Sequence, residues 1–244
     1  MKSIEIVSHC WAGELKIYAQ LLRLQISSLI LRSKHECQVT LSVVYSPGDE
    51  HTTKVVDWAE KALSFRDVVL NRIPVPRKLL FQRAAGRNIA ALRTEADVVF
   101  FTDCDYLFTG TSLDDALTAC LTSPTAITFP TEVNASRTHS HGDSTILTAD
   151  MSPSMLCDIN LDDFAMTRYG KAIGGIQIVA GDRCRSLGYL PNSKWTRPLA
   201  DISRGFLPCR CDVRFRKSVG EKNEADINGV CRVRHSQRGR DCSR

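Results

Sequence analysis

The sequence lacks any long hydrophobic run. Its longest uninterrupted apolar stretches, such as Val98 to Phe101, are far shorter than the roughly 18 residues that a membrane-spanning helix needs. A secretory signal is also missing, because Glu5 interrupts the only short apolar run near the start. The chain still has 244 residues, 43% of them hydrophobic, which is enough to bury a core and excludes the disordered and fibrous classes. We therefore expect a soluble, cytoplasmic globular protein.

The sequence also has no internal repeat, no low-complexity linker and no regular cysteine framework. Its ten cysteines are therefore expected to be free, mostly buried thiols in a reducing compartment. A glycine-rich loop with basic residues after the first strand, which a nucleotidyltransferase would need, is not supplied by residues 9–13. A single domain with a variable second half is the interpretation that remains.

Charge is unevenly distributed along the chain, although the net charge is only +5. Residues 1–170 carry 16 basic and 20 acidic side chains, whereas residues 171–244 carry 16 basic and 7 acidic ones. Twelve of these sixteen cations are arginines, whose planar guanidinium suits phosphate and carboxylate groups. The last third of the chain is therefore expected to face an anionic partner.

Strand and helix periodicities alternate through the first half of the chain. Strands are predicted at 4–8, 39–45, 67–70 and 97–102, and helices at 14–31, 52–64 and 79–94. Because each connection must cross over, this order predicts an α/β fold with a mainly parallel sheet covered by helices on both faces. The second half predicts helices at 112–122 and 182–187, strands at 126–130, 176–180 and 230–234, and a long surface loop over 131–160.

Two carboxylates, Asp103 and Asp105, directly follow the predicted strand 97–102. Ligands of such sheets bind beyond the carboxyl ends of the strands, and the two side chains can converge on one ion if the chain turns there. Arg83 and Arg87 lie one turn apart on the preceding helix. The alternatives are that the two aspartates only cap a helix or a turn, and that the two arginines lie on a solvated helix face.

The stretch Arg87-Asn88-Ile-Ala90, followed by the strand that ends in Asp103-Cys-Asp105, resembles the signature of GT-A glycosyltransferases, especially a large inverting family. The resemblance implies a single GT-A domain over 1–244, with a nucleotide-sugar-binding half at 1–110 and a mixed acceptor-binding half at 111–244. It further implies that Asp105 binds Mn²⁺ or Mg²⁺, that Asp103 contacts the ribose or metal-bound water, and that Arg83, Arg87 and Asn88 belong to the nucleotide site. A UDP-sugar is the favoured donor.

The loop after the first strand is expected to line the same nucleotide pocket, through Ser8, His9 and Trp11. A plain core aromatic is the alternative for Trp11. The family usually ends its second strand in paired acidic residues that hold the base; here Asp49 or Glu50 would have to substitute from a few residues further on.

Later segments extend the resemblance to the metal and the acceptor. His235 stands where related enzymes place a further metal ligand, and Gly174-Gly175 matches a glycine pair where the backbone approaches the sugar closely.

The segment from Cys211 to Arg216 resembles the one that carries the catalytic base of inverting members. Asp212 is the first candidate for this base and Asp201 the second, while a helix N-cap is the structural alternative for Asp212. Arg214 and Arg216 are expected on the acceptor side.

The resemblance places the metal and the donor in the acidic first part of the chain and the acceptor in the basic last third. We therefore expect a polyanionic acceptor. Hydroxymethylated DNA is one candidate, and an acidic glycan or a phosphate-bearing lipid intermediate is the other. Two alternatives of another kind stay open: a nucleic-acid-binding protein without catalysis, and a structural zinc site that would use Cys209, Cys211, Cys231, His235 and Cys242.

Overall fold

The computed structural model describes residues 1–13, 16–64, 66–139, 156–190 and 211–236, and the fold below refers to these residues. The helices are α1 (Ile17–Leu31), α2 (Glu50–Leu63), α3 (Arg77–Leu80), α4 (Arg83–Arg93), α5 (Ser112–Thr122), α6 (Gly181–Leu187) and α7 (Cys211–Val219). The strands are β1 (Ser3–His9), β2 (Gln38–Tyr45), β3 (Val68–Pro74), β4 (Val98–Phe101), β5 (Tyr106–Phe108), β6 (Ile127–Pro130), β7 (Glu132–Ala135), β8 (Ala165–Arg168), β9 (Gln177–Ala180), β10 (Lys222–Ala225) and β11 (Val230–Arg232).

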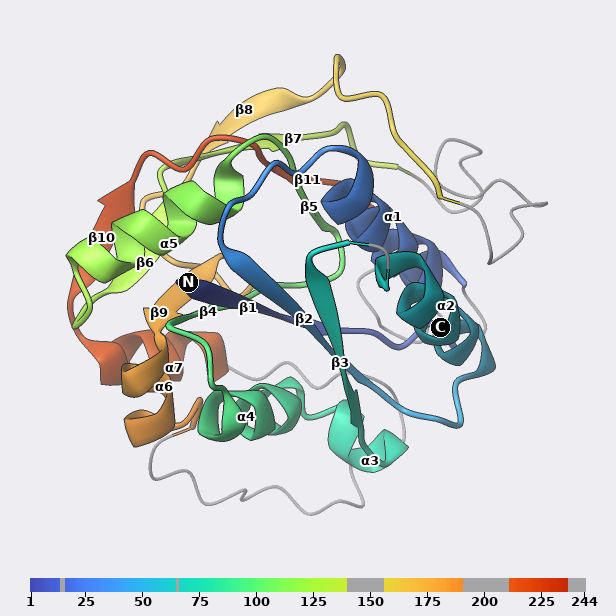
Figure 1. Ribbon diagram of the computed structural model, residues 1–244, viewed down its shortest axis with the longest axis horizontal. Helices are drawn as coiled ribbons and strands as arrows, with labels where there is room; N and C mark the ends of the chain where they lie inside the picture. The colour runs from blue at the N-terminus through green and yellow to red at the C-terminus, as the bar shows by residue number, and fades with distance from the viewer. Residues whose placement is uncertain (14–15, 65, 140–155, 191–210, 237–244) are drawn as a thin grey trace.

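A seven-stranded sheet in the order β10-β6-β9-β4-β1-β2-β3 forms the centre of the molecule (Figure 1). The strands β4, β1, β2 and β3 are parallel to one another, whereas β9 runs antiparallel to β4 and β6. The parallel α/β core predicted from the alternating pattern is therefore confirmed.

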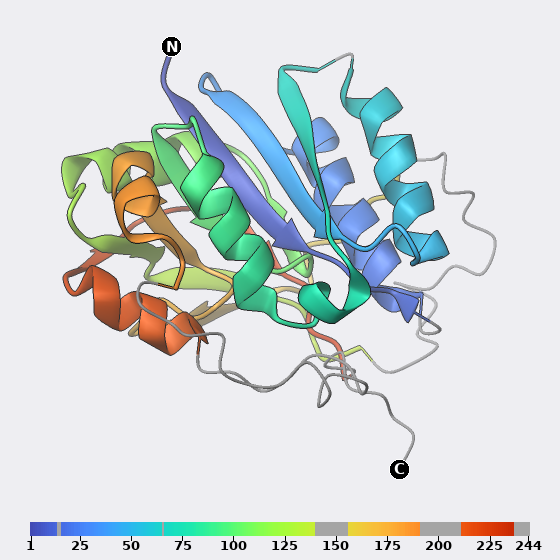
Figure 2. The same ribbon diagram turned by 90° about the horizontal axis from the view of Figure 1, so that it is seen from below.

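Helices cover both faces of this sheet (Figures 1 and 2). Alternate residues of β4 point to opposite faces: Val98 and Phe100 belong to the core cluster beneath α1, α2 and α5, while Val99 and Phe101 belong to the cluster beneath α3, α4, α6 and α7. A strand that is buried on both faces must be apolar throughout, which explains the continuous apolar sequence of β4.

A second sheet, in the order β5-β11-β7-β8, lies beyond the end of β4. Its strand β11 pairs antiparallel with β5, so that Arg232 lies opposite Tyr106. This pairing brings the end of the described chain next to the two carboxylates that follow β4.

The structure corrects two sequence predictions. The helix predicted over 79–94 is broken into α3 and α4, because Gln82 has a ψ of 77° and caps α4 without a side-chain hydrogen bond. Its neighbour Phe81 is buried and meets the ring of Trp11 edge-on, at 5.2 Å between centroids. The loop predicted over 131–160 contains the strand β7, which the pattern did not predict; residues 140–155 lie outside the described part of the chain.

The eight cysteines in the described part of the chain are all buried, and none of them forms a disulfide. Among the described helices, none is both long enough and apolar enough to cross a membrane.

Candidate active site

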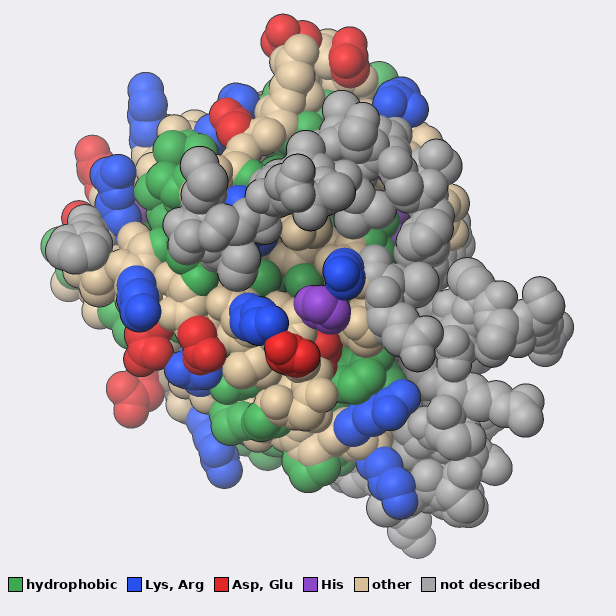
Figure 3. Space-filling model, turned by 90° about the vertical axis from the view of Figure 1, so that its right-hand side faces the viewer, with side chains coloured by type: hydrophobic (Ala, Val, Ile, Leu, Met, Phe, Trp, Pro, Cys, Tyr) green, Lys and Arg blue, Asp and Glu red, His purple; other side chains and the backbone are tan. Residues whose placement is uncertain are grey.

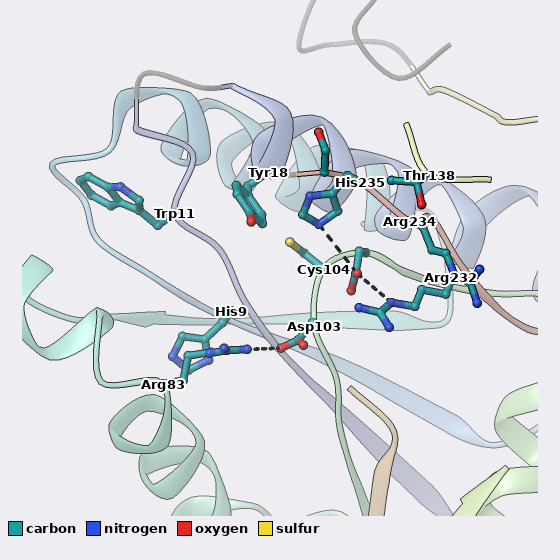
Figure 4. Close-up of a pocket in the computed structure, with 12 residues that line it drawn as sticks. His9, Trp11, Tyr18, Arg83, Asp103, Cys104, Thr138, Arg232, Arg234 and His235 are labelled. Atoms are coloured by element: carbon teal, nitrogen blue, oxygen red, sulfur yellow. Dashed lines mark hydrogen bonds and ion pairs between the residues drawn. The ribbon is translucent and has the colours of Figure 1, made fainter. Parts of the chain in front are cut away.

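A cavity of about 440 Å³ opens at the carboxyl ends of β1 and β4 (Figure 4). It is lined by side chains from separate parts of the chain: His9, Trp11, Tyr18, Arg83, Asp103, Cys104, Asp105, Thr138, Arg232, Arg234, His235 and Ser236. On the face shown in Figure 3, basic and acidic side chains lie beside a histidine side chain. The position agrees with the rule that open α/β sheets bind ligands beyond the carboxyl ends of their strands.

A turn after β4 brings Asp103 and Asp105 to the same cavity. The amide of Tyr106 donates to the carbonyl of Asp103 at 3.2 Å, which closes the turn. The buried Gln25 on α1 then donates from Nε2 to the carbonyls of Asp103 and Tyr106, at 3.1 and 2.9 Å. The sequence predicted that the chain must turn here, but nothing in it indicated Gln25.

Two arginines of α4 hold Asp103, and they do so differently. Arg87 is 1% exposed and donates from Nη2 to Asp103 Oδ1 at 2.9 Å, whereas Arg83 is partly exposed and lies 3.4 Å from the same oxygen. Burial alone would raise the pKa of Asp103, but the charges of Arg83, Arg87 and Arg232, together with His9, outweigh it and lower this pKa below the ordinary value. Asp103 is therefore an ionised carboxylate at neutral pH, and Arg83 also faces the cavity.

Asp105 is paired from the other side, by Arg232 at the end of β11 and by His235 three residues further on. Arg232 Nε lies 3.0 Å from Asp105 Oδ2, and His235 Nε2 lies 3.9 Å from the same oxygen. Burial raises the pKa of Asp105 to about 6, with Arg232 opposing the rise and Asp103 adding to it. Its other oxygen, Oδ1, is buried and accepts no hydrogen bond from the described residues.

The donor set fits a hard divalent cation. A buried carboxylate oxygen without a partner costs about 1–3 kcal/mol or more, so Asp105 Oδ1 is an atom that favours a ligand. Asp103, Asp105 and His235 all line the cavity and supply the oxygen and nitrogen atoms suited to Mn²⁺ or Mg²⁺. No group of three or more potential ligands is already gathered at metal-binding distance among the described residues. The described residues therefore contain no cluster that would bind the structural zinc considered above. Of the cysteines proposed for that site, Cys231 is buried in the core, and Cys209 and Cys242 lie outside the described residues.

The loop after β1 contributes His9 and Trp11 to the cavity wall. His9 is 5% exposed, and neither ring nitrogen has a hydrogen-bond partner among the described residues. Burial, together with the charges of Arg87 and Arg83, lowers the pKa of His9 well below its ordinary value, so the ring is neutral. Gly86 makes room for this ring, since a Cβ at Gly86 would lie 2.7 Å from His9 Cε1. Ser8 is fully buried in β1 and does not line the cavity.

Two residues predicted to contact the nucleotide hold backbone near the site. Asp49 caps α2, accepts from the Thr52 amide and hydroxyl, and also accepts from the amide of Ala12 at 2.6 Å. Asn88 Oδ1 accepts from the amide of Tyr189 at 2.9 Å. Asp49 therefore fixes the loop that carries Trp11, and Asn88 fixes the segment after α6.

The structure also locates the predicted acceptor-side residues. A Cβ at Gly175 would lie 2.2 Å from Tyr106 Cε2, so this glycine lets the backbone approach an aromatic ring. A Cβ at Gly174 would lie 3.5 Å from Asp212 Cβ and 3.7 Å from Arg87 Nη1. Asp212, in the first turn of α7, is thus brought close to the arginine that holds Asp103.

The remaining acceptor-side candidates have different environments. Arg214 is exposed on α7, whereas Arg216 donates from Nη1 to the carbonyl of Ala172 at 2.6 Å. Asp201, the second candidate for the base, lies outside the described residues.

Comparison with known proteins gives a match at the level of structure only. No protein-family model matches the sequence, and no curated protein matches it either. The structure of S. aureus TarS 1-349 in complex with UDP is similar, with a TM-score of 0.58 at 13% identity, covering 96% of this chain and 60% of that one. A second S. aureus TarS structure has a TM-score of 0.52 at 14% identity, covering 98% of this chain and 36% of that one.

This chain therefore spans less than two thirds of either TarS structure. The likeness establishes the fold, and the GT-A-like architecture predicted from the resemblance is confirmed.

Proposed function

We propose that this protein is a metal-dependent glycosyltransferase, which moves a sugar from a nucleoside-diphosphate sugar to a hydroxyl group of an acceptor. The observation that carries the proposal is the convergence of Asp103 and Asp105, at the end of β4, on a cavity that three arginines also line. The volume of about 440 Å³ lies in the range typical of sites for small ligands. UDP in the similar TarS structure supports a UDP-sugar as donor.

The chemistry requires neutralisation of the diphosphate as it leaves. Mn²⁺ or Mg²⁺, held by Asp103, Asp105 and His235, would supply this positive charge without needing a proton. Arg83 and Arg232 lie on either side of Asp103 (Figure 4) and would contact the diphosphate oxygens directly. Arg87 is too deeply buried for this role and orients Asp103 instead.

We propose Asp212 as the catalytic base of an inverting reaction. Its carboxylate would take the proton of the acceptor hydroxyl while the hydroxyl oxygen bonds to the anomeric carbon and the bond from that carbon to the diphosphate oxygen breaks. The proximity of Asp212 to Gly174 and Arg87 supports this assignment.

For the acceptor we propose a polyanion, with hydroxymethylated DNA as the first candidate and a glycan as the alternative. The exposed Arg214, together with Arg232 and Arg234 at the cavity, provides cations suited to phosphate groups. A modified base in duplex DNA would have to leave the base stack to reach the sugar.

The test is a mass-spectrometric screen of nucleotide sugars with Mn²⁺ against hydroxymethylated duplex DNA and glycan acceptors. We expect a glycosylated product from one donor, and a loss of at least about 100-fold in turnover for Asp105→Asn. Asp67→Asn, which changes an exposed carboxylate before β3, is the matched control and keeps full activity. Absence of both transfer and nucleotide binding in the wild type would refute the proposal. Full activity of Asp105→Asn in the presence of a chelator would refute the metal role.

A further inference from the structure

A chain of buried hydrogen bonds connects Asp103 with the first turn of α7. Arg87 donates from Nη2 to Asp103 Oδ1 at 2.9 Å and from Nη1 to the hydroxyl of Tyr189 at 2.8 Å. The Tyr189 hydroxyl donates to Gln177 Oε1 at 2.6 Å, and Gln177 Nε2 donates to the main-chain oxygen of Asp212 at 3.0 Å. Arg87, Tyr189 and Gln177 are at most 1% exposed, so water does not compete for these bonds.

The chemistry of the groups fixes the direction of every bond in this chain. A guanidinium group can only donate, so the Tyr189 hydroxyl accepts from Arg87 and has its single proton left for Gln177. Gln177 must then present its carbonyl oxygen to Tyr189 and its amino group to Asp212. Reversing the Gln177 amide would place two donors or two acceptors together, and the network therefore has one arrangement.

Packing also holds the Tyr189 ring in place. The ring stacks on Phe215 of α7 at 4.3 Å between centroids and meets Phe101 of β4 at 4.8 Å. Its main-chain amide donates to Asn88 Oδ1. Tyr189 is thus fixed between β4, which Asp103 follows, α4, which carries Arg87, and α7, which carries Asp212.

We infer that Tyr189 and Gln177 are positioning residues, which hold the first turn of α7, and with it the Asp212 carboxylate, at a set place relative to Asp103. Neither of them is among the described residues that line the cavity, and they act through their hydrogen bonds to Arg87 and to the main-chain oxygen of Asp212. The catalytic part of this inference rests on the proposed function, in which Asp103 serves the donor and Asp212 the acceptor. Groups that react together must be held within a fraction of an ångström for full rate, which is what such a network provides.

The test is Tyr189→Phe in the full chain, which removes one hydroxyl and keeps the ring. We expect amide hydrogen exchange of residues 211–219 to rise at least about tenfold. We expect kcat to fall at least about tenfold, while KM for the donor changes less than about threefold. Tyr45→Phe is the matched control, because the Tyr45 hydroxyl also accepts from an arginine, Arg72 Nε at 3.3 Å, away from the cavity.

The double variant Tyr189→Phe/Asp212→Asn separates positioning from a general loss of structure. If Tyr189 acts by placing Asp212, the double variant is as slow as Asp212→Asn alone, whereas losses that multiply would overturn the inference. Unchanged exchange over 211–219 would also overturn it, and this measurement requires no turnover. Failure of the wild type both to bind a nucleotide and to transfer any sugar would instead refute the proposed function, so the two failures are distinguishable.

Discussion

Replacement of Arg87 by methionine tests how much the buried ion pair of Arg87 with Asp103 contributes to the free energy of unfolding. The side chain donates three hydrogen bonds, to Asp103 Oδ1, to the carbonyl of Thr102 and to the hydroxyl of Tyr189, at 2.8–3.0 Å. Methionine replaces the unbranched apolar stem of the arginine and has no charge, so Arg87→Met removes these bonds and keeps the packing of the stem. Arg83→Met is the natural comparison, since Arg83 pairs with the same oxygen from a partly exposed position at 3.4 Å.

The two substitutions should differ widely in their effect on the free energy of unfolding. Breaking a buried, hydrogen-bonded ion pair costs about 3–5 kcal/mol, because the remaining charge and acceptors stay buried without partners. An exposed ion pair contributes about 0–1 kcal/mol, which is the whole effect expected for Arg83→Met. At about 2–4 °C per kcal/mol for a domain of this size, Arg87→Met should lower the Tm by roughly 6–20 °C.

Urea denaturation followed by circular dichroism measures both effects, with Tm values from calorimetry as a second readout. The pKa of Asp103 lies below its ordinary value in the folded state, so its stabilising contribution is present above about pH 4 and is lost as the pH falls further. The difference between wild type and Arg87→Met should shrink accordingly at low pH. Equal losses for Arg87→Met and Arg83→Met, at neutral pH, would refute the reasoning.

Three further predictions concern the surroundings of the site. Gly175→Ala places a Cβ 2.2 Å from the ring of Tyr106 and should lower the free energy of unfolding, measured by urea denaturation, by about 1–3 kcal/mol. Gly170→Ala, with open space around it, should lower it far less, and equal effects of the two substitutions would contradict this prediction. Asp49→Ala removes a helix cap, so it should lower the free energy of unfolding by about 1–2 kcal/mol in the same assay and weaken UDP binding in calorimetry. Unchanged UDP affinity would mean that the loop after β1 does not need the support of Asp49. The metal-free Asp105 carboxyl should titrate near pH 6 in a ¹³C NMR titration, and a titration near pH 4 would contradict this prediction. Because this pKa lies above the unfolded value, the contribution of Asp105 to stability falls as the pH rises from about 4 to about 6.

The sequence predicted the parallel core well, because strands buried on both faces are apolar throughout and the connecting helices have a clear period. It failed where structure depends on distant contacts. β7 has only four residues, Glu132–Ala135, and its alternating burial is set by the strands β11 and β8 beside it. At the break before α4, Phe81 packs against Trp11, a contact between distant segments that a helical period cannot reveal.

The candidate site was predictable in its acidic part and less so in its partners. Asp103 and Asp105 follow directly from a strand end, and the structure brings both to one cavity with His235. Arg232 was visible only as one of many cations in the last third of the chain, since its pairing with Asp105 depends on the register of β11 against β5. Gln25 and Tyr189 carry no local signal, because their roles depend on buried hydrogen bonds across long sequence separations.

The pairing of Arg232 with Asp105 joins residues 127 positions apart, and it has a consequence for the order of folding. The strands β1 to β4 can assemble from the first part of the chain, but one wall of the cavity is complete only after β11 docks on β5. Contacts of such long sequence separation form slowly, because the intervening chain must be ordered before they are made. Under the proposed function, a nucleotide present during refolding would therefore bind only the finished structure, so it would slow unfolding and raise the Tm without accelerating the early collapse.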